Sequence, residues 1–158
     1  MDLFVHTQGK DEPDIVTVEE TELVRSLVVE GSGDQIWVTE QVEEVRLDVT
    51  FAEAGIAHHH HVHRGHCELL HADVRYVTAH GRVERKTHDM GPTASIGRVL
   101  DWAVGDEGFN LPADQRPEYV LALPEAKEYL ASDVRVITLV NQDCSVHLDL
   151  LPKDHFGG

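Results

Sequence analysis

The feature that most constrains the fold is an internal repeat, because the chain carries one order of strand and helix patterns twice within 158 residues. Alternating apolar residues place one side of a strand on a core, whereas apolar residues spaced three and four apart form one face of a helix. The first copy has alternation at 3–7, a turn at 9–14, a strand at 15–18 and a helical stripe at 23–28. Glycines at 31 and 33 end this predicted helix.

The second copy begins 71 residues after the first, where Asp73, Val74 and Thr78 align with Asp2, Leu3 and Thr7. Its patterns predict a hairpin from strands at 74–78 and 83–87, a helix at 96–104, and strands at 119–123, 134–140 and 146–150. The repeat therefore predicts an α+β chain of two small domains in tandem, with a boundary near residues 66–72. One larger sandwich with a single helix is the alternative.

The charge balance excludes some classes of partner. The chain has 29 acidic and 13 basic residues and a formal net charge of −16. Nucleic-acid binding requires a basic surface, and anionic membranes repel an acidic one, so we expect neither partner. No apolar stretch approaches the ~20 residues that a membrane-spanning helix needs. A strongly acidic surface suits basic protein partners, or it serves solubility alone.

The cysteines and the first residues favour a cytoplasmic location. The segment Met1–His6 lacks a basic region followed by a long apolar one, so no secretory signal is expected. Two cysteines, Cys67 and Cys144, do not make a disulfide framework. We expect both to be reduced and to act as small buried apolar residues rather than as nucleophiles.

Seven of the 12 histidines fall within residues 58–71. On a strand, His61 and His63 point to one face, and Glu68 follows five residues later, which resembles the first metal motif of cupins. Arg75 stands where this motif would have its closing glycine, and the second cupin motif is absent from the sequence. Three interpretations stay open: a solvated His-rich strand and linker, a metal- or pH-sensitive patch, and a catalytic metal centre of a small cupin-type enzyme. The remaining histidines, His6 among them, are expected to be ordinary surface or half-buried residues.

Several segments resemble ubiquitin. A hairpin, a helix and further strands is the element order of the ubiquitin-like β-grasp fold. Residues 1–7 resemble its opening strand, residues 50–56 the turn before its last strand, and residues 112–116 its helix-exit segment, and Gly157-Gly158 follow an apolar strand. The doubled pattern resembles the interferon-induced tandem modifier of animals and, more closely, bacterial tandem ubiquitin-like modifiers of Bil- and Bub-type operons. Residues 34–48 and 124–140 have no clear counterpart, and residues 152–156 replace the basic tail of ubiquitin.

The resemblance implies two β-grasp domains, at 1–68 and 69–151, and a flexible conjugation tail at 152–158. Pro152 and the polar residues after it are expected to hold this tail away from the domain as a short mobile extension. The carboxylate of Gly158 would form the bond to a target, while Gly157 and Phe156 would be recognised in the tail. The implied partners are an ATP-using activating enzyme, a conjugating enzyme, a deconjugating protease and lysines of target proteins. The implied role is bacterial antiphage defence, in which virion proteins are the targets. The chain itself would have no catalytic residues and no cofactor. A pair of β-grasp domains that is never conjugated is a further alternative.

Overall fold

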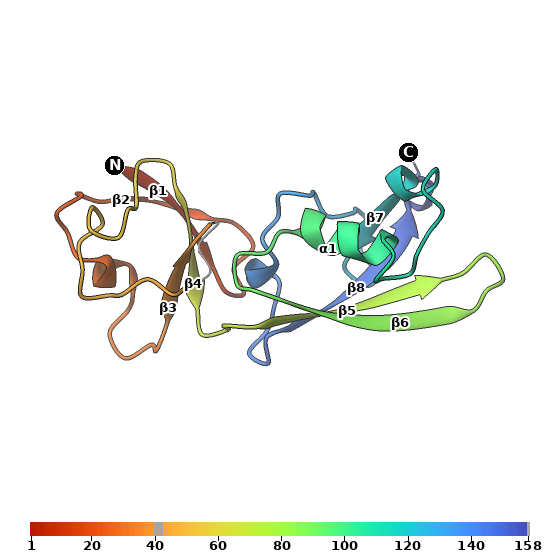
Figure 1. Ribbon diagram of the computed structural model, residues 1–158, viewed down its shortest axis with the longest axis horizontal. Coiled ribbons are helices and arrows are strands. Elements are labelled where there is room, and N and C mark those ends of the chain that lie inside the picture. Colours follow the sequence, from red (N-terminus) through yellow and green to blue (C-terminus); the bar gives the residue numbers. More distant parts are fainter. Residues whose placement is uncertain (40–42, 158) are drawn as a thin grey trace.

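In the computed structural model, which describes residues 1–39 and 43–157, the chain folds as two four-stranded sheets side by side along the long axis (Figure 1). The first sheet has the order β2-β1-β4-β3, with β1 Asp2–Thr7, β2 Asp14–Thr17, β3 Gln35–Val38 and β4 His61–Gly65. The second has the order β6-β5-β8-β7, with β5 Leu70–Val77, β6 Val83–Met90, β7 Tyr119–Ala122 and β8 Ser145–Pro152. In each sheet the middle pair is parallel and both outer pairs are antiparallel.

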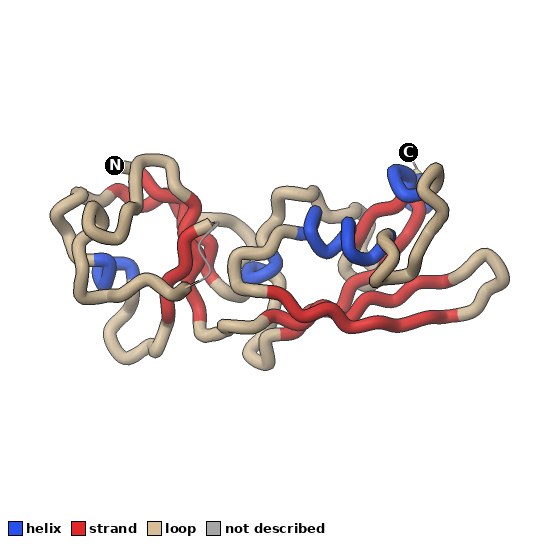
Figure 2. The backbone as a smooth tube through the Cα atoms, viewed as in Figure 1, coloured by secondary structure: helices blue, strands red, loops and turns tan. Residues whose placement is uncertain are grey.

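The helix predicted at 96–104 is confirmed as α1, Ile96–Val104, which lies over the second sheet (Figure 2). The hydroxyl of Ser95 caps the helix by accepting a hydrogen bond from the Arg98 N–H. Its buried face carries Ile96, Val99 and Ala103. The described part of the chain is therefore of the α+β class, as expected.

Two predicted elements are wrong. The helical stripe at 23–28 forms only the 3₁₀ turn η1, Val24–Leu27, because the stripe is short and contains β-branched valines. The strand predicted at 134–140 contains instead the 3₁₀ turn η3, Val136–Thr138. All three residues of η3 are buried, which an alternating strand at one edge of a core would not achieve. Two further 3₁₀ turns are η2, Arg116–Glu118, and η4, Lys153–Phe156.

The sequence repeat extends to the backbone hydrogen bonds. Three bonds of the first half have equivalents in the second: Val24 N–H to Val49 O with Ile96 N–H to Val134 O, Arg25 N–H to Leu47 O with Gly97 N–H to Ser132 O, and Phe51 N–H to Glu22 O with Val136 N–H to Ala94 O. In these bonds, the residues at 22–25 have their equivalents 72 positions later in the sequence, and the residues at 47–51 have theirs 85 positions later. The turn η1 thus occupies the place where α1 begins, and the turn at 50–56 occupies the place of η3.

Each half also has its own buried apolar cluster. The first contains Leu3, Val5 and Phe51, and the second contains the buried face of α1 together with β5 and β8 residues such as Leu70 and Leu148. Trp37 is the exception, because it lies on β3 of the first sheet but packs in the second cluster, where it is 2% exposed. Burial of so large an aromatic side chain ties the two halves together.

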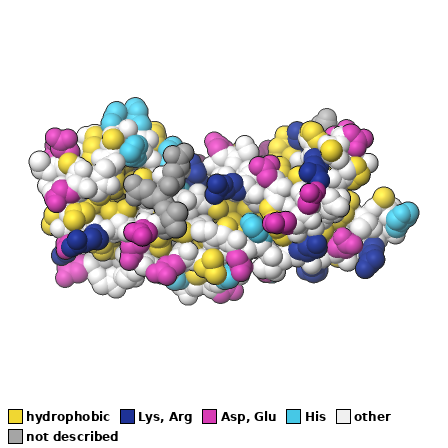
Figure 3. Space-filling view, viewed as in Figure 1, with side chains coloured by type: hydrophobic (Ala, Val, Ile, Leu, Met, Phe, Trp, Pro, Cys, Tyr) yellow, Lys and Arg dark blue, Asp and Glu magenta, His cyan; other side chains and the backbone are white. Residues whose placement is uncertain are grey.

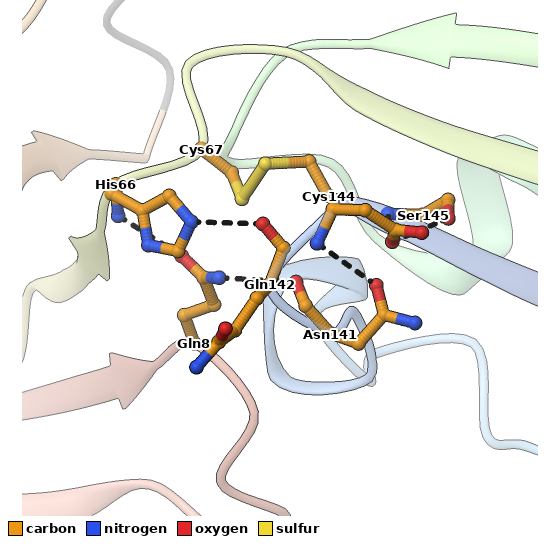
Figure 4. Close-up of a disulfide and its surroundings, with 8 residues drawn as sticks. Gln8, His66, Cys67, Asn141, Gln142, Cys144 and Ser145 are labelled. Atoms are coloured by element: carbon orange, nitrogen blue, oxygen red, sulfur yellow. Dashed lines mark hydrogen bonds between the residues drawn. A yellow bond between two sulfur atoms is a disulfide. The ribbon is translucent and has the colours of Figure 1, made fainter.

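Polar contacts and a disulfide complete the junction between the halves. The Gly9 N–H donates to Ile137 O at 3.1 Å, and the side-chain amide of Gln8 donates to Asn141 O at 3.2 Å. Cys67 and Cys144 are joined as a disulfide, with Cα atoms 5.6 Å apart (Figure 4). The prediction of two free, reduced cysteines is therefore wrong for this structure, because the fold places residues 77 apart in sequence beside each other.

The surface shows the acidic character of the composition. Asp and Glu side chains are scattered over the visible face of both halves, and histidines gather along one edge of the first half (Figure 3). None of the helices in the described part of the chain has the length and apolar character needed to cross a membrane.

Candidate functional site

The C-terminal segment leaves the second sheet from its centre. β8 lies between β5 and β7 and ends at Pro152, which pairs with Tyr119. The next residues do not extend away from the domain, as the sequence had predicted for 152–158, but form the turn η4. The ring of Phe156 is half-buried and lies 5.5 Å from the ring of Tyr129, which explains why the segment stays close to the surface.

Gly157 caps this turn in a conformation that favours glycine. Its φ is +76°, and its N–H donates to Asp154 O at 3.1 Å. No heavy atom would lie within 4 Å of a Cβ added there, and the residue is exposed. The predicted attachment residue, Gly158, lies outside the described residues. The described end of the chain is thus on the surface of the second half, away from the junction (Figure 1).

The sequence correctly predicts that His61 and His63 share a face of one strand, and the fold adds a third imidazole. Parallel pairing of β1 with β4 places His6 opposite His63. A hydrogen bond of 2.8 Å joins the His6 and His61 rings, and the His6 and His63 rings are stacked at 5.1 Å. His6 is 7% exposed and His63 fully buried, so the expectation that His6 is an ordinary surface or half-buried residue is wrong.

The environment of these rings keeps them neutral. Burial, with the neighbouring His6 and the Arg135 guanidinium, lowers the pKa of His63 to about 3. Burial, with His61 and Arg135, lowers the pKa of His6 to about 4. Burial also lowers the pKa of His61. Arg135 belongs to the second half, so the cluster lies at the junction, and neither ring nitrogen of His63 has a hydrogen-bond partner among the described residues.

The cupin-like ligand set is not assembled. Glu68 accepts a hydrogen bond from the side-chain amide of Gln35 at 2.7 Å, and within the described residues His61, His63 and Glu68 do not bring three ligand atoms within 4.8 Å of one another. The described residues that do so are the groups His66, Cys67, Cys144 and Asp2, His58, His59. Of the three interpretations of the His-rich segment, the cupin-type metal centre at His61, His63 and Glu68 therefore gains no support from the described residues.

Comparison with known protein families finds a match in the second half of the chain. Residues 76–153 match the family described as BilA ubiquitin-like domain 2. The match begins at Tyr76, near the end of β5, and ends at Lys153. It therefore contains β6, α1, β7 and β8 but only the last two residues of β5, and it stops before Phe156. No curated protein sequence matches the chain significantly.

Proposed function

The second half of this chain, residues 76–153, is a ubiquitin-like domain of the Bil type, and from that premise we propose that the chain is a protein modifier conjugated through Gly158. Membership in this family confirms the resemblance to bacterial Bil-type proteins. The observation that carries the proposal is the continuity of this ubiquitin-like domain, through β8, with the exposed Gly157, which precedes Gly158 in the sequence. A carboxylate is a poor electrophile, so its activation requires separate enzymes and ATP.

The proposal includes a second ubiquitin-like domain in the first half. The shared strand order and the three equivalent hydrogen-bond pairs support tandem β-grasp domains at 1–68 and 69–151, with residues 152–158 as the conjugation segment. Two domains give partner enzymes two points of contact, which raises affinity through effective concentration. Phe156 and Gly157 form the part of the segment that an activating enzyme would recognise after the Phe156 ring leaves Tyr129.

In this proposal the chain is a substrate of enzymes rather than an enzyme, and it needs no cofactor of its own. An activating enzyme forms an acyl-adenylate and then a cysteine thioester, a conjugating enzyme receives the acyl group, and a target lysine displaces the thiol. A protease reverses the isopeptide bond. The setting is the bacterial cytoplasm during antiphage defence, with virion proteins as targets, where a bulky acidic adduct blocks assembly interfaces.

The test is reconstitution of the chain with ATP and the activating and conjugating enzymes of its own source. We expect an adduct on each enzyme that thiols cleave, and a thiol-resistant adduct on a target lysine. Lys153 is the last lysine or arginine of the sequence, so trypsin leaves residues 154–158 on the modified lysine, a remnant that mass spectrometry identifies. Deletion of Gly158 should abolish all three products.

A control variant is needed because Cys67 and Cys144 can themselves form thiol-labile mixed disulfides. The double variant Cys67→Ser, Cys144→Ser removes that route and should keep every adduct. Adducts that survive deletion of Gly158, or enzymes that never become charged by the full chain, would overturn the proposal.

A further inference from the structure

We propose that the chain, when its disulfide is reduced, binds one Zn²⁺ through Cys67, Cys144 and His66. One ligand atom from each of these residues lies within 4.8 Å of the other two. Figure 4 shows the His66 ring beside the Cys67 side chain, with Cys144 approaching from the start of β8. This inference concerns the junction between the halves and does not depend on the proposed conjugation.

Hydrogen bonds hold His66 and Cys144 in place without help from the sulfur–sulfur bond, and Cys67 follows His66 directly in the chain. The His66 N–H donates to the Gln8 side-chain oxygen at 2.9 Å, and the same Gln8 side chain donates to Asn141 O. On the other side, the Cys144 N–H donates to Asn141 O at 3.1 Å, and Cys144 O accepts from the His71 N–H at 2.9 Å. Reduction therefore leaves two thiols and an imidazole held near one point.

The ligand types select the metal. Two thiolates and an imidazole nitrogen are soft and borderline donors, which suit Zn²⁺ and do not suit Mg²⁺ or Ca²⁺. Cα atoms 5.6 Å apart allow both cysteine side chains to reach one ion. Cys67 is buried, whereas His66 is exposed, so water has access to the fourth position of a tetrahedral site.

The exchange between the two states balances with an external dithiol as the reductant. The dithiol supplies two electrons and two protons, breaks the Cys67–Cys144 bond and is itself oxidised to a disulfide. Zn²⁺ then displaces the two thiol protons, and the neutral imidazole of His66 donates its lone pair. In a reducing compartment the metal would thus replace the disulfide as the link between the halves.

The experiment measures zinc binding by the full chain under anaerobic conditions, with a chromophoric chelator as competitor. The second cluster, Asp2, His58 and His59, is removed beforehand by the double variant His58→Gln, His59→Gln, which is the background for all other variants. We expect about one Zn²⁺ per reduced chain and less than about a tenth of an equivalent per oxidised chain. With Co²⁺, the reduced chain should show the near-ultraviolet charge-transfer band of thiolate ligands.

Single variants assign the ligands. Cys67→Ser or Cys144→Ser should weaken zinc binding by at least about 100-fold and remove the cobalt band, and His66→Gln should weaken it by about 10- to 100-fold. His80→Gln, on the exposed turn between β5 and β6, is the matched histidine control and should change nothing. A reduced chain that takes up no zinc, or one that binds equally with both cysteines replaced, would overturn the proposal.

Discussion

Acidification from pH 7.5 to 4.5 is expected to lower the free energy of unfolding by about 5 kcal/mol through His6 and His63. Both histidines have an ordinary pKa of 6.5 when unfolded, and burial lowers these pKa values to about 4 and about 3 in the folded chain. Because the unfolded state binds protons first, stability is lost as pH falls below 6.5. Two pH units below that value correspond to about 2.5 kcal/mol for each histidine.

The charges that face these rings come from both halves. His6 and His63 face each other and His61 from β1 and β4, and Arg135 faces them from the segment before η3, while Asp133 acts on His61. A proton on either buried ring therefore meets a cation and other imidazoles. Hydrogen bonds lower the pKa of several surface carboxyls, such as that of Asp2, below the usual 3.8, so the stability that they provide is lost only at still lower pH.

The measurement is urea unfolding at a series of pH values, followed by the fluorescence of Trp37 in the Trp102→Phe background. Replacement of His63 by Leu keeps an apolar side chain at the site and removes the titrating group. In that variant the stability difference between pH 7.5 and 4.5 should shrink by about 2.5 kcal/mol, whatever its stability at pH 7.5. His80→Gln should leave the difference unchanged. A variant that keeps the full pH dependence would contradict the assignment to His63.

The strands and the helix could be predicted because their determinants are local. Alternation at 3–7 and 146–150 corresponds to β1 and β8, and the apolar face at 96–104 corresponds to α1. The strand β3 was missed because its four residues include Ile36, Trp37 and Val38 in an unbroken apolar run, which shows no alternation. The turns η1 and η3 could not be predicted, because long-range hydrogen bonds from residues such as Val24 and Val136 set their geometry.

The candidate sites depend even more on distant contacts. The spacing of His61 and His63 predicted that they share a face, but only the β1–β4 pairing brings His6 to them. The pairing of Cys67 with Cys144 has no sequence signal, since 77 residues separate them. The closeness of the junction, with Trp37 of one sheet inside the other core, is likewise a product of tertiary packing.

Reduction of the Cys67–Cys144 disulfide is expected to cost about 4 kcal/mol of folding free energy when no metal is present. The bond closes a loop of 77 residues, and its loss restores the conformational entropy of that loop to the unfolded chain. Urea unfolding with and without a reductant, in the presence of a chelator, measures this change. The double variant Cys67→Ser, Cys144→Ser should have the stability of the reduced wild type.

The comparison between reduced and substituted chains also separates the covalent link from the contacts around it. The bonds of Gly9 with Ile137 and of Gln8 with Asn141 do not involve sulfur, and Trp37 is buried in the second core. We expect all of these contacts to remain after reduction. The junction should therefore persist at pH 7.5 in the double variant, with Trp37 still shielded from a fluorescence quencher. The double variant should not respond to reductant, which controls for effects elsewhere. A loss of less than about 1 kcal/mol on reduction of the wild type would mean that the disulfide does not constrain the unfolded chain, contrary to the loop-closure argument.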